Sequence, residues 1–350
     1  MSVFEHPITS GLFGDLEAQA PWSAEQQLSH YIAFETALAE SLEQHGFVEA
    51  GEGSAAIKTL AAFQVDMDAL VNDMSQDGVP IPNLVKQMRA AAGGAHKAVH
   101  TGATSQDVMD TALSLTLKSV TDIVLNRLQD VTGSLSQIIE TYGQNPMTGR
   151  TRMQAALPIT VADRFDVYLS ALTEDTSRLS SDRSKVERLQ LGGPVGTNKA
   201  FGDDAESVSQ HMASHLGLTV APGVWHADRT QIVSFANQLS LITGTLGKLG
   251  QDVALMAQQG VDEITLASGG TSSAMPHKSN PVGAELLVTL ARYNAGQIGL
   301  LHNAMIHEQE RSGAAWMLEW MVLPQICTTT CLALKTATTL CTSIKKLGKQ

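Results

Sequence analysis

The chain has 350 residues and a net charge of −12 at pH 7, and 43% of its residues are hydrophobic while 17% are charged. This composition supports a large packed core and argues against intrinsic disorder. The acidic balance argues against nucleic acid or an anionic membrane as the main partner, because both carry negative charge. An anionic small substrate stays compatible with it, since the local charge of a pocket can oppose the net charge.

The sequence shows no targeting segment and no membrane span. From Met1 to Gly14 there is no basic segment followed by a long apolar run, and no apolar run in the chain approaches the roughly 18 residues that cross a bilayer. The three cysteines, Cys327, Cys331 and Cys341, have no histidine nearby. We therefore expect buried free thiols in a reducing compartment, and a cytoplasmic protein.

The first part of the chain holds short helical patterns. Prolines and glycines interrupt them, among them Pro7, Pro21, Gly46 and Pro80. We predict a small helical N-terminal domain over residues 1–100, with its boundary near Gly93-Gly94 to Gly102.

Long apolar stripes dominate the rest. Apolar residues recur at steps of three or four from Leu113 to Tyr142 and from Ile232 to Met256, and no proline interrupts them. The first stripe predicts a helix on the order of 45 Å long. Further long helices are expected over about 284–308 and 318–346, with an amphipathic stretch over 159–191, and convincing strands are scarce. The predicted fold is all-α, with a long-helix bundle over residues 101–350. Apolar stripes this long must pack against partner helices over their whole length, which favours a homo-oligomer.

A polar segment, His100 to Asp107, comes just before the first long stripe. One reading is structural, because Thr104, Ser105 or Asp107 can cap the helix that follows. The other is functional, because the N–H groups and hydroxyls at a helix N-terminus also grip a carboxylate. Both readings can hold together.

A second polar segment runs Gly149-Arg150-Thr151-Arg152-Met153-Gln154-Ala155-Ala156-Leu157-Pro158. Arg152 can clamp a carboxylate with two parallel hydrogen bonds, but it cannot exchange protons near neutral pH. The plain alternative is a surface arginine in an ion pair.

Two further patterns do not indicate a functional site. The cluster Gly192 to Thr197 lacks the spacing of a dinucleotide-binding loop and follows no strand. The histidines show no metal-ligand spacing together, so no metal site is expected.

The most specific segment runs Gly269-Gly270-Thr271-Ser272-Ser273-Ala274-Met275-Pro276-His277-Lys278-Ser279-Asn280-Pro281. Ser/Gly/Pro loops are often simple connectors, and a phosphate loop fits badly because His277 stands where that motif needs glycine. From Ser272 to Pro281, however, the string resembles the signature of the fumarase/aspartase superfamily, Ser-Ser-x-Met-Pro-x-Lys-x-Asn-Pro, at every specified position.

Other segments extend this resemblance over nearly the whole chain. Residues 100–112 are similar to the first conserved region of the superfamily. Residues 149–158 are similar to the second, except that Arg152 stands where most members have histidine. The segments Trp225–Arg229 and His307–Trp320 look like those of 3-carboxy-cis,cis-muconate cycloisomerases. Taken alone, an aromatic pair such as Trp316 and Trp320 is more often part of a core or an interface than of a site.

The resemblance implies an all-α homotetramer in which each active site takes residues from three subunits. It also implies that the usual C-terminal domain is absent or truncated here. The implied substrate is a small tricarboxylate, and the implied reaction is lactonisation of 3-carboxy-cis,cis-muconate. No cofactor is implied, since the nucleophile and the proton acceptor both belong to the substrate. The alternatives are another lyase of the superfamily such as adenylosuccinate lyase, a cycloisomerase of a related muconate, and a non-catalytic helical protein like the lens crystallins that share the fold.

The resemblance also assigns residues. Ser272 is the candidate for proton transfer, and Lys278 is expected to stabilise the carbanion as an aci-carboxylate. Arg152, the third candidate catalytic residue, is expected to bind a substrate carboxylate. The candidate substrate-binding residues are His100, Thr104, Ser105, Gln106, Gln154, Arg229, Met275, Asn280 and Arg311.

Overall fold

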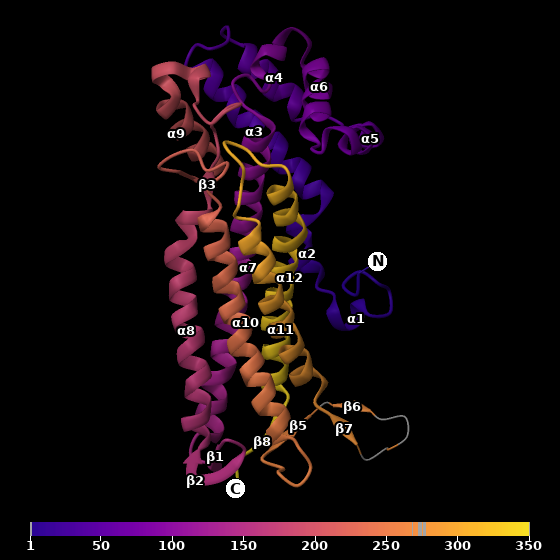
Figure 1. Ribbon diagram of the computed structural model, residues 1–350, viewed down its shortest axis with the longest axis vertical. Coiled ribbons are helices and arrows are strands. Elements are labelled where there is room, and N and C mark those ends of the chain that lie inside the picture. The colour runs from indigo at the N-terminus through magenta and orange to yellow at the C-terminus, as the bar shows by residue number, and fades with distance from the viewer. Residues whose placement is uncertain (1, 268, 272–274, 276–277, 350) are drawn as a thin grey trace.

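The computed structural model describes residues 2–267, 269–271, 275 and 278–349, and it shows an elongated helical bundle (Figure 1). The all-α prediction is confirmed. The long helices are α7 (Ser105–Tyr142), α8 (Val161–Val186), α10 (Thr230–Met256), α11 (Val282–Asn303) and α12 (Ala314–Thr342).

The apolar stripes of these helices form one continuous core. Leu117, Leu128 and Leu135 of α7 are fully buried in it, together with Leu239 and Leu246 of α10. Burying a leucine stabilises the fold by about 1.5–3 kcal/mol before entropy is counted. The helices thus follow from the periodicity in the sequence, and α8 starts where Asp163 accepts the N–H of its N-cap residue, Thr160.

Two predicted helix ends were placed too late. Helix α11 ends at Asn303 rather than near residue 308, and α12 ends at Thr342 rather than near residue 346. After α12 the chain forms strand β8 (Ile344–Leu347), which pairs antiparallel with β5 (Ile264–Leu266). The pairing satisfies the backbone while it buries Ile344 and Leu347 in the core.

By length and composition, α12 is apolar enough to cross a membrane, but 61% of its most apolar window is buried inside the structure. A core helix of a bundle passes the same test. Pro324 lies inside this helix and lacks the N–H that would bond to the preceding turn.

Shorter helices cover the end of the bundle where α7 begins. A second core joins most of them to residues near 200, so this core draws on both parts of the chain, whereas the elements over residues 10–22 pack against the first core. The division at residue 100 stays a prediction. These elements are α1 (Ser10–Phe13), α2 (Leu16–Gln19), η1 (Ala20–Trp22), α3 (Ala24–Gln44), α4 (Glu52–Leu60), α5 (Met67–Asp77), α6 (Ile81–Ala92), η2 (Gly93–Ala98), η3 (Lys199–Asp204) and α9 (Ala205–Leu216).

Short strands complete the described part of the chain. Strands β1 (Pro146–Thr151) and β2 (Gln154–Thr160) form an antiparallel hairpin, and β6 (Gly270–Thr271) and β7 (Ser279–Asn280) form another. Both hairpins lie at the end of the bundle opposite to α3 and α9 (Figure 1). Strands β3 (Arg188–Leu189) and β4 (Thr219–Val220) pair in parallel near α9.

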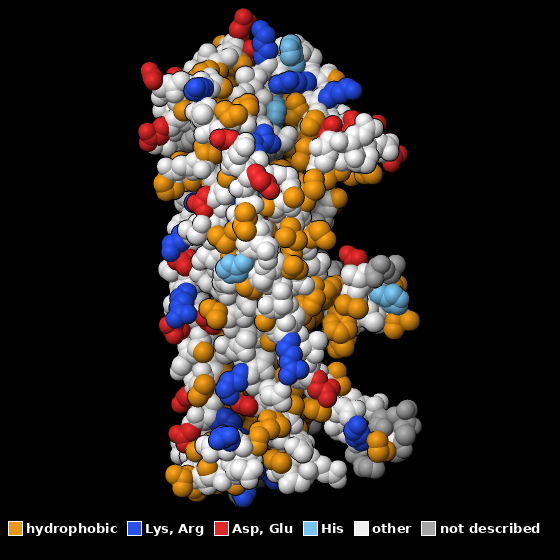
Figure 2. Space-filling model, in the orientation of Figure 1, with side chains coloured by type: hydrophobic (Ala, Val, Ile, Leu, Met, Phe, Trp, Pro, Cys, Tyr) orange, Lys and Arg blue, Asp and Glu red, His pale blue; other side chains and the backbone are white. Residues whose placement is uncertain are grey.

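The face drawn in Figure 2 is uneven in charge. Lysine, arginine, aspartate and glutamate side chains follow the edge formed by α8, whereas the centre over α10 and α11 is largely uncharged (Figure 2). Leu241 of α10 and Leu300 of α11 are 57% and 45% exposed, and Met321 of α12 is 73% exposed. Large exposed apolar side chains along neighbouring helices are typical of a surface that contacts another protein.

Candidate active site

The start of α7 is held by one buried carboxylate. Asp107 accepts the N–H of Thr104 at 2.9 Å, and it also accepts the N–H groups of Gly192 and Gly193 at 2.8 and 2.9 Å. A fourth donor is Nε2 of His226, at 2.8 Å. Asp107 therefore ties the helix N-terminus, the Gly192 turn and His226 into one unit.

Arg311 lies against this unit. One of its Nη atoms donates to Oγ1 of Thr104 at 2.6 Å, and its Nε donates to Oε1 of Gln106 at 3.4 Å. Gln106 is fully buried, and its amide nitrogen donates to Asp110 at 3.1 Å and to the carbonyl of His226 at 2.9 Å. The side-chain oxygen of Gln106 thus accepts from Arg311 and orients it, and the guanidinium of Arg311 is a cation suited to a carboxylate.

Arg229 lies in a buried ionic network. It donates to both oxygens of Asp110 at 2.9 and 3.1 Å and to both oxygens of Glu319. Trp316 adds a donor to Asp110 at 3.3 Å. Burial alone would lower the pKa of Arg229, but the two carboxylates outweigh it and raise that pKa above its ordinary value. Arg229 is 1% exposed and bound to two carboxylates, so its link to Arg311 runs through Asp110 and Gln106.

His100 is held by a second buried carboxylate. Its Nδ1 lies 2.6 Å from Oε1 of Glu35, and its backbone N–H donates to Oε2 of Glu35 at 2.8 Å. The backbone of His100 is left-handed, with φ of 59°. Burial works against protonation of the ring, but the charge and hydrogen bond of Glu35 outweigh it and raise the pKa of His100.

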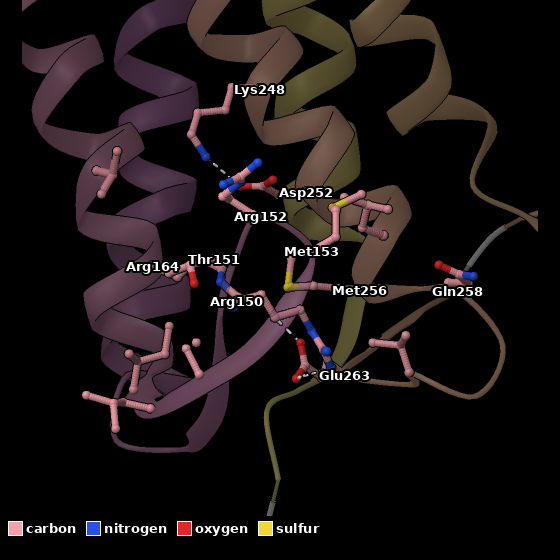
Figure 3. A pocket seen from close by; sticks show the side chains of 17 residues that line it. Arg150, Thr151, Arg152, Met153, Arg164, Lys248, Asp252, Met256, Gln258 and Glu263 are labelled. Carbon is pink, nitrogen blue, oxygen red and sulfur yellow. Dashed lines mark hydrogen bonds and ion pairs between the residues drawn. The ribbon is translucent and has the colours of Figure 1, made fainter.

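At the other end of the bundle, Arg152 sits at the tip of the β1–β2 hairpin (Figure 3). Thr151 pairs with Gln154, so Arg152 and Met153 form a two-residue turn, with φ of 47° and 68°. Hairpin turns with two positive φ angles usually hold glycine or asparagine. A left-handed backbone costs other residues roughly 1–2 kcal/mol each, so strain is stored at the tip that presents Arg152.

A cavity of about 810 Å³ lies beneath this tip. Its charged lining comes from β1, the Arg152 turn, the helices α8 and α10, and the segment after α10. It includes more cations than carboxylates: Arg150, Arg152, Arg164 and Lys248 against Asp252 and Glu263 (Figure 3). Glu263 binds Arg164 at 3.3 Å, and Asp252 binds Lys248 at 2.6 Å. The surplus of positive charge suits an anionic ligand, although the chain as a whole is acidic.

The remaining candidates lie near this end or outside the described residues. Gln154 begins β2 and is exposed. Asn280 pairs with Gly270, and the N–H of Lys278 donates to the carbonyl of Met275 at 3.0 Å. Ser272 lies outside the described residues.

One chain does not bring all these candidates together. His100, Thr104, Ser105, Gln106, Arg229 and Arg311 gather where α7 begins, whereas Arg152, Gln154, Met275, Lys278 and Asn280 lie beyond its other end. Helix α7 has 38 residues, which corresponds to roughly 55 Å. Within a single chain, therefore, the two groups cannot contact one small molecule.

Residues that position the site were harder to identify from the sequence. Asp107 was considered only as a cap, and Glu35, Asp110, His226 and Glu319 were given no role. A Thr-x-x-Asp spacing before an apolar run is a signal for the Asp107 contact. No local signal exists for His226, which is 119 positions from its partner Asp107. In the described part of the chain, no group of three or more His, Cys, Asp or Glu is arranged to hold a metal ion.

The chain is similar to known proteins along most of its length. A family model described as lyase matches residues 16–296. The chain belongs to the lyase family. It is 37% identical to a 3-carboxy-cis,cis-muconate cycloisomerase of Pseudomonas putida over 86% of this chain and 73% of the relative. It is 36% identical to a protein of the same name from Pseudomonas aeruginosa, over 88% and 69%.

The fold is shared as well. The crystal structure of the 3-carboxy-cis,cis-muconate lactonizing enzyme from Pseudomonas putida superposes with a TM-score of 0.89 at 34% identity, covering 96% of this chain and 76% of that one. The resemblance to the fumarase/aspartase superfamily is confirmed by these lyase-family matches.

Proposed function

We propose that this lyase-family chain is a cycloisomerase that converts 3-carboxy-cis,cis-muconate to a carboxymuconolactone. The observation that carries the proposal is Arg152 at the tip of a hairpin over a cationic cavity, in a chain similar to cycloisomerases along most of its length. Arginine at this position holds a carboxylate but does not exchange protons near neutral pH. That property suits a reaction in which the substrate supplies its own nucleophile.

The reaction has two steps and needs one proton. A carboxylate oxygen of the substrate adds to a conjugated double bond and forms the lactone C–O bond. The electron pair of that double bond moves to the carbon next to a second carboxylate. This second carboxylate then shares the pair as an aci-carboxylate and carries extra negative charge. A proton delivered to that carbon completes the isomerisation. Preorganised cations and N–H donors stabilise the extra charge best in a site that excludes water.

The residues divide this work. Arg311, with Thr104 and Ser105 at the start of α7, holds one carboxylate, and Arg152 holds another. Lys278 and Asn280 stabilise the aci-carboxylate, and Ser272 delivers the proton. His100, Gln154 and Met275 contact the substrate around these groups, while Gln106 and Arg229 act through Arg311.

Separate chains must then complete each site. A homotetramer brings the start of α7 in one copy near the Arg152 hairpin of another, and near the Lys278 segment of a third. The exposed apolar side chains Leu241, Leu300 and Met321 support such an assembly, since they run along three neighbouring long helices. We place the assembled enzyme in the cytoplasm, with no nucleic-acid or membrane partner.

The test is a substrate comparison with the purified protein. Loss of the conjugated chromophore is followed with 3-carboxy-cis,cis-muconate, while fumarate and adenylosuccinate are followed by their own absorbance. Only the first should turn over, and Ser272→Ala should lower its turnover by roughly 10²–10⁴, the usual contribution of an acid–base group. Turnover of adenylosuccinate instead would assign the chain to another lyase activity, and no turnover of any would favour a non-catalytic role.

A further inference from the structure

A separate cavity lies between the N-terminal helices and the bundle, and none of Thr104, Arg152 and Arg311 lines it. Its volume is about 270 Å³. An apolar cavity of roughly 150 Å³ already holds a benzene ring, so there is room here for one substituted ring. The aromatic residues of its wall are Trp22, Tyr31, Trp316 and Trp320.

The aromatic wall is ordered by its own contacts. The rings of Trp316 and Trp320 meet edge to face, with centroids 4.7 Å apart. The indole nitrogen of Trp316 donates to Asp110. Burial raises the pKa of Tyr31 to about 12, so its phenol stays uncharged near neutral pH. Fixed, offset rings of this kind favour an aromatic guest, which gains edge-to-face contacts beyond simple burial.

One polar group in the wall has no partner. The indole nitrogen of Trp22 is buried and makes no hydrogen bond within the described residues. A buried donor left unsatisfied costs about 1–3 kcal/mol. A ligand oxygen in the cavity would remove that cost.

The charge of the wall selects against anions. Asp110 and Glu319 both line the cavity, and the single guanidinium of Arg229 lies between them in the buried network. Among the described residues, the lining of the cavity contains no lysine, arginine or histidine of its own, and Arg229 is already bound by two carboxyl groups. The oxygens of both carboxylates already accept hydrogen bonds from Arg229. A carboxylate ligand would therefore lose its hydration without gaining a cation, whereas an uncharged ring needs none.

We propose that this cavity binds a small uncharged aromatic molecule that carries one oxygen acceptor, such as a phenol, with the oxygen accepting from the Trp22 indole. The site goes beyond the proposed reaction, because its described lining offers no cation to the polycarboxylate substrate. It does not depend on that reaction.

The test uses the full-length protein in its native assembly, with 4-fluorophenol as the probe and 4-fluorobenzoate as its anionic control. Fluorine-19 NMR line broadening is titrated for both. 4-Fluorophenol should bind saturably, and 4-fluorobenzoate at least about tenfold more weakly, as a difference of roughly 1.4 kcal/mol requires. Absence of 4-fluorophenol binding, or equal binding of the two probes, overturns the proposal.

Variants then locate the site. Leu113→Trp and Met74→Trp fill the cavity from two different walls and should each abolish binding, whereas Ser177→Trp on the exposed face of α8 should leave it unchanged. Trp22→Phe keeps the ring but removes the donor, so binding should weaken about 2- to 12-fold, as expected for one neutral hydrogen bond. Circular dichroism establishes that each variant is folded. Undiminished binding in the folded filling variants, or in Trp22→Phe, contradicts the assigned site.

Discussion

At the end of the bundle where α7 begins, Arg229 and Asp107 are buried and fully paired, whereas the cavity at the hairpin end has more cations than carboxylates and Arg152 is exposed. Arg229 donates to two carboxylates there, and Asp107 accepts from four donors. Arg152, by contrast, is exposed on a strained turn over a cavity with more cations than carboxylates. The paired groups fix geometry, and the surplus groups remain available to a ligand.

We therefore expect the paired groups to contribute mainly to stability, and the surplus cations to contribute mainly to ligand binding. Removing one partner of a buried ion pair leaves an uncompensated charge, which is expensive. Removing an exposed arginine leaves the fold alone, but takes away charge that a ligand would use. The two ends should therefore respond to substitution in different measurements.

The largest effect on stability is expected at Arg229. Arg229→Met keeps much of the side-chain volume but leaves Asp110 and Glu319 facing each other without a cation, so the free energy of unfolding should fall by about 3–5 kcal/mol. Thermal melting measures the loss. The matched variant Arg152→Met should stay within about 0.5 kcal/mol of the parent. Equal melting temperatures for the two variants would contradict the view that Arg229 stabilises the fold and Arg152 does not.

Activity should depend on both ends at once. Arg311→Ala and Arg152→Ala each remove a carboxylate clamp, and each should lower kcat/KM by roughly 10²–10³, as the loss of a charged hydrogen-bonded partner does. If separate chains supply the two arginines, co-expression of the two variants restores some sites in which both residues are wild type. Mixed assemblies purified by two tags should then regain activity, and persistent inactivity would contradict a shared site.

The His100–Glu35 pair predicts a pH dependence of stability. The pKa of His100 is raised in the folded state, so the stabilisation is complete below the unfolded pKa near 6.5 and is lost as pH rises through the raised folded pKa. The difference in melting temperature between wild type and His100→Gln should be largest near pH 5.5 and shrink at higher pH. A difference that grows with pH would contradict a charged pair.

The smallest effect is expected at the hairpin tip. Met153→Gly removes the strain of a left-handed backbone in the folded state, but glycine also raises the conformational entropy of the unfolded chain. The free energy of unfolding should therefore rise by less than about 1 kcal/mol. Ala156→Gly in the extended strand β2 is the control, and it should destabilise by roughly 0.5–1 kcal/mol. Thermal melting of both variants decides whether the turn is strained.

The long helices were predictable because their apolar stripes are regular over many turns, as in Leu113 to Tyr142. Their ends were less so. Helix α12 was expected to reach about residue 346, but burial of Ile344 and Leu347 beside β5 is a tertiary effect. The Arg152–Met153 turn was missed because neither residue is typical of a turn with two positive φ angles.

The site was predictable only as a set of segments. The signature from Ser272 to Pro281 and the polar segments around Thr104 and Arg152 identified candidates, but nothing local placed them at opposite ends of α7. The partners that fix them are distant in sequence. Glu35 meets His100 across 65 positions, and Gln106 meets Arg311 across 205. Such pairings depend on the packed fold.

Strand β2 has a consequence for how the chain is made. Its residues Gln154 to Pro158 are exposed in the single chain, and Leu157 is 77% exposed. A newly synthesised copy therefore carries an apolar edge strand, which is a template for unwanted pairing with other chains. The homotetramer proposed above would cover this strand. The yield of soluble protein should accordingly rise when translation is slowed and chaperones are abundant, because each chain then has time to find its partners before it aggregates.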